Sequence, residues 1–247
     1  MSTGLDGIKA EAEAELTDAT GEERDFLCGV IKSLAACDGI IERYRVRAEI
    51  DGRKGLAAAL SQVPKRGARS YYEALLTVKF MVYALRLNRN VHTPLGRVDQ
   101  YMKPYYELSK NVGATDEEIK ELTELFFISL NFDTDIYLGV QTGDNGQSMV
   151  LGGMTPDGED GANALTEICL AASEELKLID PKINLRVNER TPISVYERGT
   201  RLTKQGLGFP QYMNDDVVIP ALTAWGYDER DARNYAVAAC WEVIMSG

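Results

Sequence analysis

Cys240 and Glu242 stand two residues apart near the end of the sequence, with Trp241 between them. A thiol and a carboxylate at this spacing can act on one substrate, the sulfur on a carbon and the carboxylate on a proton. A neighbouring carboxylate raises the pKa of a thiol, so the pair is poorly suited to a thiolate nucleophile. It suits a cysteine that works as a neutral sulfur radical while the carboxylate moves a substrate proton.

Other interpretations of this cysteine stay open. Free cysteines are commonly buried as small hydrophobic residues, which would make Cys240 purely structural. A cysteine–histidine nucleophile pair has little support, because His92 is the only histidine and no family signature links the two. The scattered spacing of the four cysteines, without a CxxC pair, also disfavours a zinc site and a disulfide framework; they are Cys28, Cys37, Cys169 and Cys240.

Composition narrows the class of protein. The 247 residues are 45% hydrophobic, so a sizeable core is expected, and the formal net charge of −11 disfavours a surface that binds nucleic acid. The N-terminal "MSTGLDGIKAEAEAEL" lacks the apolar region of a secretory signal. No stretch approaches the ~20 apolar residues of a membrane helix. We therefore expect a cytoplasmic protein without membrane or nucleic-acid partners.

The first half of the sequence predicts helices. Apolar residues recur at helical spacing over residues 21–50, and residues 70–87 are apolar on several sides, as in a buried helix. Thr115 and Glu118 form a capping-box signature at the start of another helix. We expect residues 1–131 to be the mainly helical part of one domain and residues 132–247 to be its parallel α/β part, opening with loops and short strands.

The last third of the chain alternates strand and helix signals. "KINLRV", "GFPQYM" and "YAVAAC" read as strands, with helices predicted over 192–206 and 215–226, the second capped at Asp215 or Asp216. Strands and helices at this spacing predict right-handed βαβ units and a parallel sheet. The fold class that follows is α/β.

In parallel α/β sheets, ligands bind at the carboxyl ends of the strands. Asn214 and Asp215 follow one predicted strand, and Cys240 and Glu242 fall at the end of the next. The pattern therefore predicts that Cys240 lies at the ligand-binding edge of the sheet.

Several separate segments resemble the glycyl radical enzymes of the pyruvate formate-lyase superfamily. They are "GRVDQYMKPYYE", "LGGMTPDGED", "EELKLIDPKINLRV", "GFPQYMNDDVVIPAL" and "DARNYAVAACWE", in the family's order from about Tyr71 to Glu242. The resemblance implies part of a ten-stranded α/β barrel: the first parallel half-barrel, with a mainly helical N-terminal half.

The resemblance also implies roles for individual residues. Cys240 matches the finger-loop cysteine that becomes a thiyl radical, and Glu242 matches the acid of the Cys-x-Glu pattern. That pattern marks the eliminating and decarboxylating branch, and Ala239 stands where pyruvate formate-lyase itself has a second cysteine. The implied reaction is dehydratase-type elimination of a C–O, C–N or C–S bond. Decarboxylation of an arylacetate-type substrate is the alternative.

Two candidate substrate-binding residues depart from the family pattern. Trp241 is bulky where the family carries a smaller residue, and Val243 stands where proline is frequent. His92, in "NVHTPLGR", falls by register on the serine of a His-Ser pair that contacts substrate in diol dehydratases. A purely structural histidine, bonded to backbone at a helix end, stays open as the other interpretation of His92.

The family further implies a glycyl radical, installed by an activating enzyme that uses S-adenosylmethionine and an iron–sulfur cluster, and no metal or organic cofactor bound by the lyase itself. It implies a small-molecule substrate and a homodimer. The family's Arg-Val-x-Gly segment is not found here, so we expect a central fragment that is inactive alone. A non-catalytic acidic α/β scaffold or partner subunit is the alternative from another class.

Overall fold

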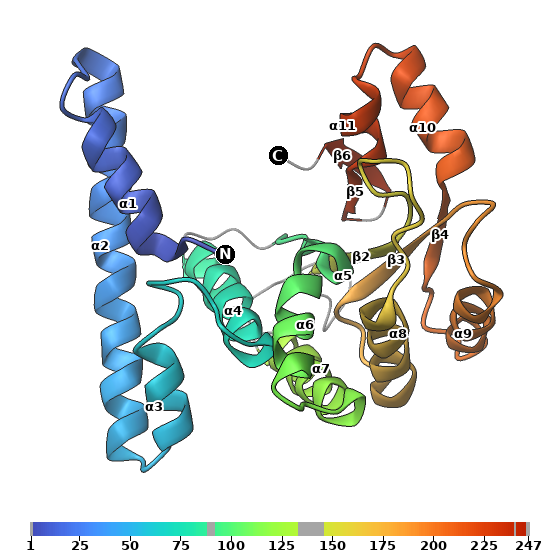
Figure 1. The fold of residues 1–247 in the computed structure, drawn as a ribbon, viewed down its shortest axis with the longest axis horizontal. Helices are drawn as coiled ribbons and strands as arrows, with labels where there is room; N and C mark the ends of the chain where they lie inside the picture. Colours follow the sequence, from blue (N-terminus) through green and yellow to red (C-terminus); the bar gives the residue numbers. More distant parts are fainter. Residues whose placement is uncertain (1, 88–91, 133–145, 240, 246–247) are drawn as a thin grey trace. The chain divides into compact units, whose positions relative to one another are not determined.

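The computed structural model describes residues 2–87, 92–132, 146–239 and 241–245 (Figure 1). The chain divides into two compact units, Met1–Ala84 and Leu85–Gly247. Each unit is described by itself below. None of the described helices is both long and apolar enough to cross a membrane.

The first unit is helical. The predicted helix over residues 21–50 is present as one element, and a small apolar cluster of Ala12, Ala19 and Leu27 joins its first turns to the preceding helix. The helix over residues 21–50 also packs against the short helix that follows it in sequence. The elements are α1 (Gly4–Glu15), α2 (Gly21–Ile50), α3 (Lys54–Leu60) and α4 (Tyr71–Leu87).

Helix α4 is buried at its beginning and exposed near its end. Tyr71 and Ala74 are almost fully buried, whereas Met81 and Leu87 are exposed. The expectation of a helix buried on several sides therefore holds only for its first turns in the described chain.

The second unit contains a four-stranded parallel sheet in the order β1-β2-β3-β4. The predicted strands over 182–187 and 208–213 both belong to it, and the α/β fold class is confirmed. The strands are β1 (Gly96–Arg97), β2 (Ser148–Gly152), β3 (Lys182–Val187) and β4 (Gln211–Asn214). The connecting helices are α5 (Val98–Tyr101), α6 (Lys103–Asn111), α7 (Asp116–Leu130), α8 (Ala164–Leu176) and α9 (Ile193–Thr203).

The two faces of β3 have different neighbours. Alternate residues of a strand point to opposite faces, so Leu185 and Arg186 diverge. Leu185 packs against Gly199 of α9, where an added Cβ would lie 3.0 Å from a Leu185 methyl group. Arg186 points to the other face, here called the inner face. The predicted capping box of Thr115 and Glu118 is present at the start of α7.

The chain beyond β4 forms a separate hairpin. After α10 (Asp215–Ala224) and α11 (Glu229–Arg233), β5 (Tyr235–Ala238) pairs antiparallel with β6 (Glu242–Met245). The prediction of a third parallel strand over 235–240 is therefore wrong. The physical reason is burial: β5 lies over the inner face, where Tyr235 and Val237 join a buried cluster with Val150 and Met213.

The direction of β5 follows from two hydrogen bonds. Arg186, near the end of β3, donates to the carbonyl of Tyr235, the first residue of β5, at 2.7 Å. Ser148, the first residue of β2, donates to the carbonyl of Val237 at 3.2 Å. Strand β5 thus runs from the carboxyl end of the parallel sheet toward its amino end. The expectation that this strand ends at the carboxyl edge is wrong.

Candidate active site

The β5–β6 turn is tight. Ala238 and Glu242 oppose each other in the ladder, which leaves residues 239–241 for the connection. Ala239 has φ +44°, a left-handed conformation that costs a non-glycine residue roughly 1–2 kcal/mol. Cys240 lies outside the described residues, so its predicted role stays a prediction based on sequence.

Glu242 and Trp241 are both exposed at this turn. The backbone N–H of Trp241 donates to Oε2 of Glu242 at 3.1 Å, and 59% of Trp241 is exposed. A carboxylate at the first position of β6, directly after the turn, can reach a molecule placed beside that turn. The geometry is therefore compatible with Glu242 as a group that moves a proton.

His92 lies at the amino end of the parallel sheet, the end toward which β5 runs. Its imidazole packs against Gly146, which has φ +65°, and a Cβ on Gly146 would overlap the ring. The N–H of Leu95 donates to the carbonyl of Ser148 at 2.7 Å, which places this loop at the amino end of β2. Because β5 runs toward that end, the structure brings His92 and the hairpin turn to one end of the sheet.

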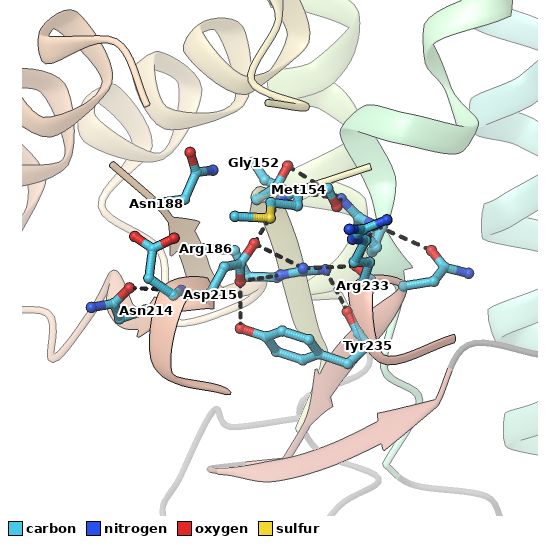
Figure 2. A network of polar contacts seen from close by, with 12 residues as sticks. Gly152, Met154, Arg186, Asn188, Asn214, Asp215, Arg233 and Tyr235 are labelled. Carbon is cyan, nitrogen blue, oxygen red and sulfur yellow. Dashed lines mark hydrogen bonds and ion pairs between the residues drawn. The ribbon is translucent and has the colours of Figure 1, made fainter. Parts of the chain in front are cut away.

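The opposite end of the hairpin is held by a buried ion pair (Figure 2). Arg186 and Asp215 are both fully buried and form two parallel bonds, Nε to Oδ1 and Nη2 to Oδ2, each 2.9 Å. The hydroxyl of Tyr235 donates to Oδ1 of Asp215 at 2.8 Å. The guanidinium lies 3.8 Å from the centre of the Tyr235 ring, a cation–π contact. We call Arg186, Asp215 and Tyr235 the root cluster.

The remaining polar atoms of the root cluster are also used. Arg186 donates to the carbonyls of Tyr235 at 2.7 Å and Arg233 at 2.8 Å, and the N–H of Met154 donates to Oδ2 of Asp215 at 2.6 Å. Burial raises the pKa of Tyr235 well above its usual value, and the Asp215 carboxylate adds to the rise. The tyrosine therefore stays a hydrogen-bond donor at neutral pH.

Arg97 supports the same segment from β1. It is 5% exposed and donates to the carbonyl of Arg233 at 3.3 Å, to Oδ1 of Asn234 at 3.1 Å and to the carbonyl of Met154 at 2.7 Å. Burial lowers the pKa of Arg97 to about 10, and the nearby Arg186 cation contributes. Two buried arginines thus hold the chain where it enters β5.

Close packing around the cluster requires a glycine. Gly153 has φ +76°, and a Cβ there would lie 2.5 Å from Nε of Arg186 and 2.8 Å from Oδ2 of Asp215. Any side chain at this position would displace the ion pair. The sequence "LGGM" is therefore explained by the cluster behind it.

Asn214 and Asp215 do lie at the carboxyl end of β4, as predicted, but the structure uses both internally. Asn214 caps α10 by accepting from the N–H of Asp216 at 3.0 Å, where the sequence suggested Asp215 or Asp216 as the cap. Asp215 is occupied by Arg186. Asp215 is therefore buried away from this edge, whereas Asn214 is exposed there.

Sequence reasoning missed the root cluster. The available signal was a single charged residue, Arg186, inside the apolar strand "KINLRV", together with Arg97 in "GRVDQY". Buried charges require partners, so either arginine could have prompted a search for a carboxylate. The sequence alone does not single out Asp215 as that partner.

The described part of the chain holds no group of three or more His, Cys, Asp or Glu side chains arranged to bind a metal ion. The described cysteines Cys28, Cys37 and Cys169 are free thiols. Burial raises the pKa of both Cys37 and Cys169, which keeps these two thiols protonated and unreactive at neutral pH.

Comparison with known proteins gives the same family from sequence and structure. The family model described as pyruvate formate lyase-like matches residues 1–247. The chain is 28% identical to the isethionate sulfite-lyase of Desulfovibrio desulfuricans, over 99% of this chain and 33% of that protein. It is 26% identical to the trans-4-hydroxy-L-proline dehydratase of Clostridioides difficile, over 99% of this chain and 34% of that protein.

Solved structures agree. The glycerol-bound B12-independent glycerol dehydratase from Clostridium butyricum superposes with a TM-score of 0.88 and 31% identity, covering 100% of this chain and 34% of that one. The chain thus spans about a third of the length of the relatives it matches. The parallel sheet is consistent with part of the α/β barrel that the resemblance implied. The chain therefore belongs to the pyruvate formate lyase-like family of glycyl radical enzymes.

Proposed function

We propose that the protein carrying this chain is a radical lyase that eliminates a C–O, C–N or C–S group from a small polar molecule. The observation that carries the proposal is the β5–β6 turn: Glu242 is the first residue after it, and the turn contains Cys240 in sequence. Relatives over nearly the whole chain support it, since their names describe a sulfite-lyase and dehydratases.

The proposed chemistry assigns one task to each residue. The family's glycyl radical, installed by a radical S-adenosylmethionine activating enzyme, would take the hydrogen atom of the Cys240 thiol, which leaves the unpaired electron on the sulfur. The Cys240 sulfur then removes a hydrogen atom from a substrate carbon that bears a hydroxyl group, forming S–H and a carbon radical. Glu242 accepts the hydroxyl proton, and the group on the adjacent carbon leaves with the electron pair of the broken bond, which leaves a radical beside a new carbonyl group. A basic leaving group such as hydroxide takes its proton from the protonated Glu242. The product radical takes the hydrogen atom back from Cys240, which restores the sulfur radical.

The residues at the turn fit such a radical. A carboxylate beside the thiol opposes thiolate formation but does not hinder a neutral sulfur that exchanges hydrogen atoms. Ala239 has a left-handed conformation, and Glu242 is exposed with its carboxylate accepting from the backbone N–H of Trp241. We infer that His92 and Trp241 contact the substrate, since His92 lies at the same end of the sheet as this turn.

A decarboxylase is the second candidate. The chain is 27% identical to the glycyl radical subunit of the 4-hydroxyphenylacetate decarboxylase of Clostridioides difficile. This match covers 76% of this chain and 22% of that protein. An exposed Trp241 beside the turn is suited to stacking on an aromatic substrate.

As part of the same proposal, the whole protein is a cytoplasmic homodimer that meets its activating enzyme transiently.

The experiment is an anaerobic activity assay of the whole protein with its activating enzyme and S-adenosylmethionine. Electron paramagnetic resonance gives the radical content, and product formation is measured for isethionate, (2S)-3-sulfopropanediol, glycerol, trans-4-hydroxy-L-proline and 4-hydroxyphenylacetate. We expect elimination products from one of the first four compounds. Carbon dioxide from the last alone would replace elimination by decarboxylation. A radical-bearing protein whose Glu242→Gln variant turns over as fast as wild type would remove Glu242 from the mechanism; we expect a loss of ~10² to 10⁴.

A further inference from the structure

We propose that the root cluster positions the β5–β6 hairpin, so that Arg186, Asp215 and Tyr235 act on the reaction through the placement of Glu242. This inference rests on the proposed function. The three residues touch no substrate in this account. They are positioning residues at the opposite end of β5 from the turn.

The first step of the argument is that Tyr235 is fixed in several independent ways. Its carbonyl accepts from Arg186, its hydroxyl donates to Asp215, and its ring lies under the guanidinium. All three side chains are fully buried. A side chain held at both ends and over its face has a single orientation, so the first residue of β5 is immobilised.

The second step is that β5 transmits this placement to the turn. Tyr235 and Ala238 are the ends of a four-residue strand, which spans about 10 Å at about 3.3 Å per residue. Strand β6 is held by this strand through the ladder from Tyr235–Met245 to Ala238–Glu242. The Ser148 hydroxyl fixes β5 again at Val237. The position of Glu242 therefore depends on how β5 is anchored, at Tyr235 as well as at Val237.

The third step is the nature of the anchor. Apolar side chains of similar volume often replace a buried ion pair without loss of stability, so stability alone does not explain why one is present. A bidentate pair adds directional bonds that fix orientation as well as distance. Atom abstraction needs reacting atoms about 3–3.5 Å apart, and a misplacement of about 1 Å can cost ~100-fold in rate. Directional anchoring of the turn meets that requirement.

The test compares Tyr235→Phe, which keeps the ring and removes the hydroxyl, with Tyr106→Phe, which loses one tyrosine–aspartate bond outside the hairpin. The whole protein is labelled with 5-fluorotryptophan, and the Trp241 resonance is assigned by its loss in Trp241→Phe. We expect one narrow Trp241 signal in wild type and in Tyr106→Phe. In Tyr235→Phe we expect this signal to shift and broaden, because the turn samples more than one position.

Turnover per radical is measured on the same proteins. We expect Tyr235→Phe to lower kcat by ~10- to 100-fold with KM within about twofold and radical content unchanged, which a role in stability alone would not produce below the unfolding temperature. Ser148→Ala, which releases the far end of β5, should give a smaller change in the same direction. It tests whether the anchoring of β5 controls the turn while the root cluster is intact.

An unchanged Trp241 resonance together with an unchanged kcat in Tyr235→Phe and Ser148→Ala would overturn the proposal. A different result would show that the proposed function is wrong. In that case wild-type protein would carry a full radical signal but form no product from any of the compounds tested. In that case the fluorine spectra still show whether the root cluster anchors the turn.

Discussion

The two ends of strand β5 differ in every property that bears on rigidity. At its root, Tyr235 is fully buried and bonded to a fully buried ion pair of Arg186 and Asp215. At its turn, Trp241 is 59% exposed and Ala239 is in a left-handed conformation. Stabilising contacts are concentrated about 10 Å from the residues expected to do chemistry. The difference indicates that one end of the hairpin anchors β5 in the fold, while the other end is left exposed for contact with a substrate.

The largest expected effect is the removal of the root cation. Arg186→Met leaves the Asp215 carboxylate buried without its partner, and we expect a loss of ~3–5 kcal/mol in the free energy of unfolding. The control is Arg198→Met, which breaks partly exposed pairs with Glu167 and Glu174 and should cost less than about 1 kcal/mol. Urea unfolding of the three proteins measures both losses. Equal losses in the two variants would mean that the root is no more important than a surface pair.

Next in size is the loss of a single bond at the root. Tyr235→Phe leaves Oδ1 of the buried Asp215 with one donor fewer, so we expect a loss of ~1–2 kcal/mol in the free energy of unfolding. The control is Tyr106→Phe, which removes a hydroxyl that donates to the exposed Asp116. Its free energy of unfolding should fall by less than about 0.5 kcal/mol. Thermal and urea unfolding measure both variants. A loss in Tyr106→Phe as large as that in Tyr235→Phe would contradict the difference in burial.

A smaller effect of opposite sign is expected at the turn. Ala239→Gly relieves the left-handed strain of φ +44° but adds freedom to the unfolded chain, so we expect a net gain of at most about 1 kcal/mol. The same change at Ala236, inside β5 and buried, should lower the free energy of unfolding. Paired unfolding curves measure the sign of each change. Destabilisation of similar size at both positions would show that the turn is not strained.

The smallest expected effect concerns pH and Asp99, a buried carboxyl of α5 that lies outside the root cluster. Burial raises the pKa of this carboxyl, although the N–H of Gly152 and the hydroxyl of Thr166 donate to it. A carboxyl with a raised folded-state pKa contributes stability that is fully present below its unfolded pKa of roughly 3.9 and lost as pH rises through the folded value. The unfolding free energy of wild type, relative to Asp99→Asn, should therefore increase as pH falls from about 7 toward about 4.

Unfolding by urea at several pH values measures this difference. A difference that decreases toward acid pH would mean that Asp99 is stabilised as an anion, like a carboxylate in an ion pair.

Local sequence patterns predicted several of the longer helices and two strands of the sheet, because hydrophobic spacing and capping residues act within a few positions. They failed for residues 235–240. A short apolar strand with both faces buried could form the edge strand of the parallel sheet or one strand of a hairpin over the inner face. Only the contacts with Val150 and Met213 distinguish these two arrangements.

The candidate site was predictable in part. Cys240 and Glu242 were proposed from their spacing and from the family resemblance, while β5, the strand that precedes them, was expected to run in the opposite direction. The root cluster was not predicted, because Arg186 meets a carboxylate 29 positions away and a carbonyl 49 positions away. No local pattern links residues at such separations.

The most direct test of the central claim is turnover per radical in Cys240→Ser. The whole protein is activated anaerobically, its radical is counted by electron paramagnetic resonance, and product is measured with the substrate that wild type uses. The account predicts a radical content equal to wild type and no detectable product, because serine cannot supply the sulfur that exchanges hydrogen atoms with the substrate. Product formation near the wild-type rate would show that the chemistry does not pass through Cys240, and the assignment of the β5–β6 turn as the active site would be wrong.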